Sequence, residues 1–91
     1  MYFDVVEAKH ERNHEMQLRF EDGSTGTVDF AKFIEKGTVL EAIEDIATFK
    51  AFEIQYGTLV WKNGSIDIAP EALYSEATGR KTIYPKKSSV A

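Results

Sequence analysis

The 91-residue sequence contains no cysteine, and this absence excludes several kinds of chemistry at once. Without thiols, the chain has no disulfide, no thiolate zinc site and no cysteine nucleophile. A chain without disulfides suits a reducing compartment, so we expect a cytoplasmic protein. A chain of this length is expected to form one domain with a modest core that needs no cross-link.

Other familiar signals are also missing. No apolar run approaches the roughly 18 residues that a membrane-spanning helix needs, so we expect no membrane partner. The N-terminus lacks the basic region and apolar block of a signal peptide. The glycines do not follow the G-x-G-x-x-G or G-K-[ST] spacing of phosphate-binding loops. The two histidines share one short segment with no serine signature around them, so no nucleophile with an adjacent base is indicated. We therefore expect no cofactor and no enzymatic activity.

Charge is distributed unevenly along the chain. Residues 1–70 carry 7 Lys/Arg and 13 Asp/Glu, a net charge of −6, whereas residues 71–91 carry 4 and 2, a net charge of +2. The acidic part argues against a broad nucleic-acid surface, which would need a basic patch. The basic end offers contact with an acidic partner or a phosphate backbone, although a solvated tail is the simpler interpretation. Its cations are Arg80, Lys81, Lys86 and Lys87.

Alternation of apolar and polar residues dominates the first third of the chain. It predicts strands at about residues 2–9, 16–20 and 27–30, which would form an antiparallel meander. The polar residues 10–14 are predicted to be a connection, and Asp22-Gly23 a turn. The most regular of these strands places Met16, Leu18 and Phe20 on its inner face.

After residue 29, the spacing of the apolar residues becomes typical of a helix. Asp29 is predicted to cap a short helix that Gly37 terminates. Thr38 and Glu41 fit a capping box, which predicts a helix over residues 39–48. Alternation then returns in Phe52–Tyr56, which predicts another strand.

The stretch from residue 59 to residue 74 predicts a strand, a tight turn, a second strand and a short helix. Asn63-Gly64 is typical of a two-residue type I′ hairpin turn, because both central positions need positive φ. Pro70 suits the first turn of a helix, where a missing N–H costs nothing. Leu73 and Tyr74 of this helix are predicted to point back into the core.

Gly79 is predicted to end that helix, and Thr82–Tyr84 to add a weak edge strand before Pro85. We divide the chain into a single domain at residues 1–78 and a basic tail at residues 79–91. The predicted fold class is α+β. A mainly antiparallel sheet, with an N-terminal three-strand meander and a C-terminal hairpin, would carry two or three short helices on one face.

One motif matches a catalytic pattern letter for letter. His10-Glu11-Arg12-Asn13-His14 fits H-E-x-x-H, in which two histidines on one helical face bind zinc and the glutamate acts as general base. Here the segment lies between two predicted strands, contains the turn former Asn13, and has no third histidine to complete the site. A solvated connection is therefore the favoured interpretation. The alternative is a small metal- or ligand-binding domain, or a hydrolase, that uses His10, Glu11 and His14.

Three other features have both a functional and a structural interpretation. Trp61 beside Lys62 could stack on a base or a sugar, but packing at an edge of the core is favoured. The carboxylate pairs Glu21/Asp22 and Glu44/Asp45 are more typical of solvated turns and helix surfaces than of a general acid and base. Asp67 could lie on an exposed sheet face or accept hydrogen bonds from the turn or the helix start, and the sequence leaves both open.

The sequence resembles domain-of-unknown-function family 2442 over about residues 3–76. The first half of the resemblance consists of Phe20-Glu-Asp-Gly23, Gly26 and Val28-Asp-Phe30. The second half consists of Glu44-Asp45 with Phe49, then Val60-Trp61-Lys-Asn63-Gly64, Asp67, and Pro70-Glu71 to Leu73-Tyr74. Lys62 departs from the pattern, since the family often has proline there. The resemblance implies a small prokaryotic α+β domain without an established activity, and it supplies no catalytic residue.

Two hypotheses follow for function. The resemblance implies a partner of another small protein, in an arrangement that resembles a toxin–antitoxin pair, and the lack of a catalytic set also favours an interaction module. The partner would be a second small protein or a second copy of the chain, joined through strand edges or a docked helix. An acidic face would suit a basic, RNA-directed partner, with nucleic acid contacted only indirectly or through the tail. The competing hypothesis is the metal- or ligand-binding domain described above.

Overall fold

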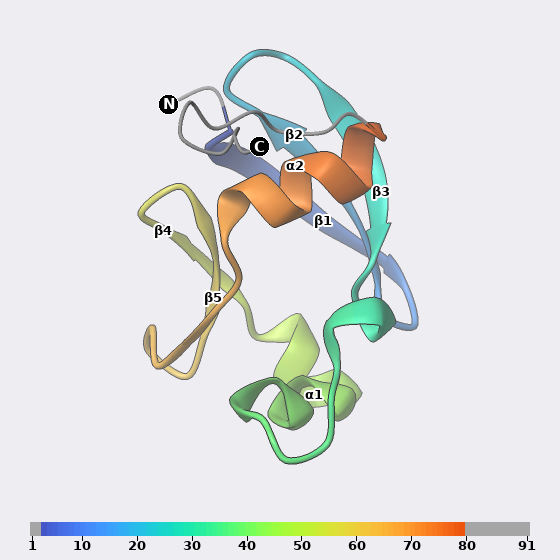
Figure 1. The fold of residues 1–91 in the computed structure, drawn as a ribbon, viewed down its shortest axis with the longest axis vertical. Helices are drawn as coiled ribbons and strands as arrows, with labels where there is room; N and C mark the ends of the chain where they lie inside the picture. The colour runs from blue at the N-terminus through green and yellow to red at the C-terminus, as the bar shows by residue number, and fades with distance from the viewer. Residues whose placement is uncertain (1–2, 80–91) are drawn as a thin grey trace, which may run out of the picture.

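Two three-stranded antiparallel sheets form the framework of residues 3–79, the part of the chain that this computed structural model describes (Figure 1). The first, sheet A, has the order β1-β2-β3, and the second, sheet B, has the order β4-β5-β6. The strands of sheet A are β1 (Val5–Arg12), β2 (Glu15–Phe20) and β3 (Thr25–Asp29), and those of sheet B are β4 (Glu53–Gln55), β5 (Thr58–Trp61) and β6 (Ile66–Asp67). The predicted α+β class is confirmed, and β4 adds a third strand beside the C-terminal hairpin.

Short helices complete the fold. They are η1 (Phe30–Phe33) and η2 (Val39–Glu44), which are 3-10 helices, and α1 (Ile46–Lys50) and α2 (Pro70–Thr78). Helix α2 packs across β3 and β2, whereas η1, η2 and α1 gather at the far end of the molecule (Figure 1). No helix within residues 3–79 is long and apolar enough to cross a membrane.

The core lies between the two sheets and the helices. Met16, Leu18 and Phe20 are completely buried, which confirms the predicted alternation along β2. At the helical end, the rings of Phe49 and Trp61 stack with centroids 6.1 Å apart, and Phe30 packs against both of them. The indole Nε1–H of Trp61 donates to the carbonyl of Phe49 at 2.9 Å, so the buried ring leaves no polar group unsatisfied.

The predicted helix over residues 39–48 is wrong in one respect, because it is divided in two at Asp45. Asp45 has an extended backbone, and its carboxylate accepts a hydrogen bond from the N–H of Thr48. A side chain that caps a new helix at this point favours interruption over continuation.

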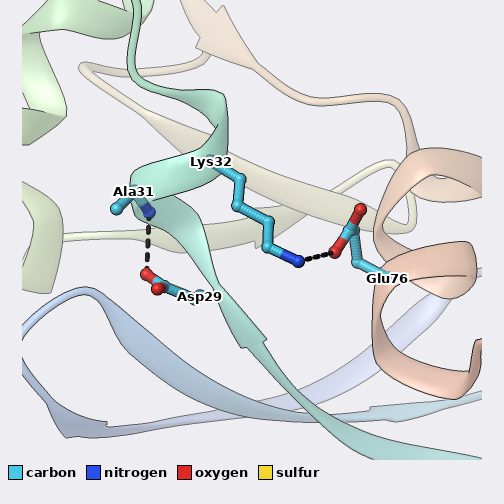
Figure 2. Close-up of polar contacts among 4 residues, drawn as sticks. All are labelled: Asp29, Ala31, Lys32 and Glu76. Atoms are coloured by element: carbon cyan, nitrogen blue, oxygen red, sulfur yellow. Dashed lines mark hydrogen bonds and ion pairs between the residues drawn. The ribbon is translucent and has the colours of Figure 1, made fainter.

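The predicted capping box does not form at Thr38. The Thr38 hydroxyl donates instead to the carbonyl of Glu35, and the Glu41 carboxylate accepts from the N–H of Gly37. By contrast, Asp29 caps η1 as predicted, because its Oδ1 accepts from the N–H of Ala31 at 3.0 Å (Figure 2).

The predicted connection at residues 10–14 is also wrong. β1 continues to Arg12, which pairs with Glu15 across a short turn containing Asn13 at φ 47°. The polar residues of this segment therefore extend a hairpin, and the guanidinium of Arg12 lies 3.5 Å from the Glu15 carboxylate.

The hairpin in sheet B forms, but its turn is longer than predicted and shifted by one residue. Trp61 pairs with Ile66, and the N–H of Gly64 donates to the carbonyl of Trp61 at 3.1 Å. The central residues of this turn are therefore Lys62 and Asn63, with φ 53° and 58°, and Gly64 follows at φ 89°. Positive φ at both central positions fits the primed turn type that was expected one residue later.

The strand predicted over Phe52–Tyr56 is shorter than expected. β4 ends at Gln55, which pairs with Thr58, so Tyr56 and Gly57 form the turn that follows, at φ 54° and 77°. Gly57 lies against the side chain of Asp4, and its carbonyl accepts from the N–H of Val5 at 2.8 Å. This contact joins the turn of sheet B to the start of β1.

Helix α2 begins and ends as predicted. Pro70 occupies its first turn, and Gly79 ends it in the left-handed conformation at φ 76°. An ion pair of 3.0 Å between Lys32 of η1 and Glu76 of α2 links the two helices (Figure 2). The predicted strand at 82–84 and the basic residues at 80, 81, 86 and 87 lie outside the described residues.

Candidate interaction site

The histidines of the H-E-x-x-H motif lie at the β1–β2 hairpin and not on a helix. Both imidazoles are half-buried and pack against the ring of Phe49, at centroid distances of 5.8 Å for His10 and 5.0 Å for His14. The prediction of a solvated connection is therefore wrong. These rings cover one side of the aromatic core because an imidazole presents an apolar face as well as polar nitrogens.

Both imidazole rings form hydrogen bonds to backbone carbonyl oxygens through Nε2. Nε2 of His10 donates to the carbonyl of Asn13 at 2.8 Å, and Nε2 of His14 donates to the carbonyls of Ile43 and Glu44 at 2.9 and 3.1 Å. A carbonyl oxygen only accepts, so each Nε2 carries a hydrogen and offers no lone pair to a metal. Within residues 3–79, no group of three or more His, Cys, Asp or Glu side chains is placed to hold a metal ion.

The carboxylate pairs noted in the sequence separate into structural roles. Asp22 accepts from the N–H of Ser24 at 2.8 Å and from the Tyr74 hydroxyl at 2.7 Å. Asp45 accepts from the backbone N–H and then the hydroxyl of Thr48, and these bonds lower the pKa of its carboxyl from the usual 3.8. A carboxylate that accepts such bonds stabilises the local fold, and Asp22 and Asp45 both do so.

The residues of the second motif block do not form one site. Trp61 and Leu73 are buried in the core, which confirms the favoured interpretation of Trp61. Asn63 and Gly64 lie in the exposed turn, and Pro70 begins α2. The side chain of Asp67 is exposed on β6, and within the described residues it has no hydrogen-bond partner, so of the two alternatives the exposed sheet face holds.

The two motif blocks of the family resemblance meet through Tyr74. Its ring packs edge-on against Phe20 at 5.1 Å, and its hydroxyl reaches Asp22. The first block runs from the end of β2 through the following turn into β3 and the start of η1, whereas Tyr74 lies in α2. These motif residues therefore hold distant parts of the fold together, and the motifs identify no catalytic residue.

A surface of another kind appears where β1 meets the β4–β5 turn. Val6, Ile54 and Tyr56 remain 44%, 38% and 94% exposed, and we call these three residues the seam patch. They belong to segments that lie side by side, because β1 contacts β4 and the N–H of Val5 donates to Gly57. Large apolar side chains left exposed on adjoining segments are candidates for an interaction site.

The flanks of the seam patch are acidic. Glu7 follows Val6, and Glu53 precedes Ile54. Asp4 contacts Gly57, and its carbonyl accepts from the N–H of Glu21 at 2.8 Å. Glu7 also forms an ion pair with Arg19 at 2.9 Å. Acidic residues beside an apolar patch favour a partner with positive charge.

Sequence reasoning missed Tyr56, because alternation placed it as an inward strand residue. A signal was nevertheless present, since a tyrosine directly before glycine can occupy a two-residue turn, in which side chains point away from the core. Among residues 3–79, the other exposed large apolar residues are Val39 and Ile46, which lie in η2 and α1, away from the seam patch.

The two antiparallel sheets and the short helices define a small α+β domain. The chain belongs to the family described as "Protein of unknown function (DUF2442)", which it matches over residues 5–79. No curated protein and no solved structure matches the chain.

Proposed function

We propose that this chain is a non-enzymatic, cytoplasmic protein-interaction module that binds a basic protein partner through the seam patch. The observation that carries the proposal is the exposure of Val6, Ile54 and Tyr56 together between acidic flanks. Tyrosine is enriched among the residues that dominate interface energies, because its ring offers a large rigid surface with a polar end. The seam patch therefore combines an aromatic side chain that can bind a partner with neighbouring charged residues that can attract it electrostatically.

The backbone around Tyr56 supports this proposal. A tyrosine at φ 54° is unfavourable by about 1–2 kcal/mol relative to an ordinary conformation. The turn is nevertheless held firmly, by the Val5–Gly57 hydrogen bond and by Asp4 against Gly57. A rigid turn presents its side chain without ordering cost at the moment of binding.

The finer assignment is an antitoxin-like or regulatory subunit paired with a small basic, RNA-directed protein. The overall charge of −4 supports it, because an acidic protein neutralises a cationic surface and speeds association with it. If this is right, co-production with the partner should relieve a growth defect that the partner causes alone.

Affinity capture from the native cell, followed by reconstitution with the identified partner, tests the module. We expect Tyr56→Ser to weaken binding by at least about tenfold, which is about 1.4 kcal/mol. Val39→Ser is the control, since it removes another exposed apolar side chain, which belongs to η2. Glu53→Lys should slow association more than Glu41→Lys does.

Three outcomes would contradict the proposal. The first is loss of the partner in Val39→Ser but not in Tyr56→Ser. The second is binding that is indifferent to salt, because steering between opposite charges is screened. The third is a chain that stays a lone monomer in the presence of the neighbouring gene product.

A further inference from the structure

Three acidic residues lead across the surface from the middle of α2 to the seam patch. Asp22 accepts from the hydroxyl of Tyr74 in α2 at 2.7 Å, and Glu21 precedes Asp22 in the chain. The N–H of Glu21 donates to the carbonyl of Asp4 at 2.8 Å, and the Asp4 carboxylate lies against Gly57 in the β4–β5 turn. We call Asp22, Glu21 and Asp4 the acidic line, because they follow one another from α2 to this turn.

Helix α2 begins near the β4–β5 turn and leads away from it. The Thr58 hydroxyl, at the end of that turn, donates to the carbonyl of Ile68, just before α2. At the other end of α2, Ala77 lies over Gly26 of β3 (Figure 1). The nine residues of α2 span about 14 Å, whereas eight extended residues span about 26 Å. Residues 80–87, which we call the basic segment, are therefore long enough to return along α2 to the seam patch.

The basic segment carries residue types in the same order as the surface along this route. The cations Arg80-Lys81 come first, Thr82-Ile83-Tyr84 contributes an aliphatic and an aromatic side chain, and Lys86-Lys87 follow. The surface presents the acidic line first, the apolar seam patch next, and Glu53 beside that patch. Each part of the basic segment therefore meets a part of the surface that complements it.

The charges of the two parts of the chain are also opposite. Residues 3–79 carry 7 Lys/Arg and 15 Asp/Glu, a net charge of −8, whereas residues 80–91 carry 4 Lys/Arg and no Asp/Glu. A segment linked to its site is present at a high effective concentration, so modest contacts are enough to hold it there.

We propose that the basic segment docks on the seam patch of its own chain and competes with the protein partner for that surface. Arg80-Lys81 bind the acidic line, and Ile83 and Tyr84 cover the apolar side chains of the seam patch. Lys86-Lys87 lie beside Glu53. The competition rests on the proposed function, whereas the docking does not, because it concerns this chain alone.

A spin label beside the basic segment tests the docking in the full chain. The native chain has no cysteine, so Ser88→Cys takes a single nitroxide label. In nuclear magnetic resonance spectra, we expect the amide signals of the seam patch to lose intensity and those of η2 and α1 to retain it. About 1 M salt should restore much of the lost intensity, because it screens the attraction between the charges.

Variants of the labelled chain separate the apolar from the charged contacts. Tyr84→Ser should restore the signals of the seam patch, whereas Val90→Ser, which removes an apolar side chain outside the basic segment, should change nothing. Arg80→Glu combined with Lys81→Glu should also restore them, and Lys36→Glu, which reverses an exposed cation elsewhere, is the control.

Two results would overturn the docking within one chain. The first is an equal loss of signal at the seam patch and at η2, or a loss that Tyr84→Ser leaves unchanged. The second comes from mixing isotope-labelled chains without the nitroxide with spin-labelled chains at natural isotope abundance. A loss of seam-patch signals in this mixture would show that the segment binds a second copy instead.

The competition is measured with the partner once it has been captured. If the basic segment covers the seam patch in about nine molecules of ten, Tyr84→Ser should tighten partner binding by about tenfold, because the whole population then becomes competent. Docking in the spin-label experiment with unchanged partner affinity would overturn the competition. Loss of the docking alone, with Tyr56→Ser still weakening the partner, would overturn this inference and leave the proposed function intact.

Discussion

Gly26 lies on β3 opposite Leu18, with α2 directly over it. A Cβ at this position would be 1.9 Å from the carbonyl oxygen of Ala77, which belongs to the backbone and cannot rotate away. The glycine of the first motif block is therefore explained by the close approach of a helix, and not by a turn.

Gly26→Ala is expected to destabilise the chain by about 2–3 kcal/mol, because α2 must move away from sheet A to admit the methyl group. Urea unfolding measures this change. Thr27→Ala is the control, since Thr27 is the next residue on β3 and is exposed. If Gly26→Ala lowered the free energy of unfolding by less than Thr27→Ala does, α2 would not be in close contact with β3.

Lys62 gives a second prediction at this scale, and it concerns the departure from the family pattern. A proline ring holds φ near −65°, whereas Lys62 has φ 53°. Lys62→Pro should therefore lower the free energy of unfolding by at least about 1–2 kcal/mol, whereas Lys62→Gly should raise it by up to about 1 kcal/mol. Thermal unfolding of the two variants shows which one loses stability and which one gains it. A proline variant as stable as the native chain would mean that the turn has another form.

At the scale of elements, the shortness of the helices depends on capping side chains. Asp45 ends the run that began at Val39 and starts α1, which contributes Phe49 to the core. Because the hydrogen bonds from Thr48 lower the pKa of the Asp45 carboxyl, its charged form is favoured in the folded state. Asp45 therefore stabilises the fold above about pH 3.8, and this contribution is lost as the pH falls through its lowered pKa.

Asp45→Asn is expected to lower the melting temperature at neutral pH, and the gap to the native chain should close in acid below the usual carboxyl pKa of 3.8. Melting curves over a pH series measure the gap. Glu44→Gln serves as the control, since Glu44 is an exposed neighbour with no cap to lose. A gap that stays constant with pH would assign the effect to packing and not to charge.

Alternation with period two predicted sheet A well, because one face of β2 is buried and the other is solvated. The helical segment between Asp29 and Lys50 was harder to predict, because side chains such as Asp45 compete for the same backbone groups that a continuous helix would use. The extension of the β1–β2 hairpin through residues 10–14 was missed because His10 and His14 count as polar in a pattern, although their rings cover Phe49. Whether an imidazole ring packs against the core depends on tertiary contacts, which a sequence pattern does not show.

At the scale of the whole molecule, the contact between Asp22 and Tyr74 closes the fold across 52 residues of sequence. Tyr74→Phe removes a hydroxyl that donates to a carboxylate, so it should destabilise the chain by about 1–2 kcal/mol. A double-mutant cycle with Asp22→Asn isolates this contact, and we expect a coupling of about 0.5–1.5 kcal/mol. Additive losses in the cycle would show that the two side chains act separately.

The candidate surfaces could be predicted only in part from the sequence. The acidic excess of the first 70 residues was visible, and it remains the basis for expecting a basic partner. The seam patch was not visible, because it joins residues about 50 positions apart whose neighbourhood depends on β1 meeting the β4–β5 turn.

The position of α2 at the end of the described chain also matters while the protein is being made. Sheet A is complete once residue 29 has been synthesised, yet the helix that covers β2 and β3 ends at Thr78. Sheet A can therefore form before the helix that covers it, and it exposes an apolar face until α2 packs against it. Slow codons or a pause before α2 would lengthen that exposure. A chaperone that binds the unfinished polypeptide would protect the exposed sheet from aggregation.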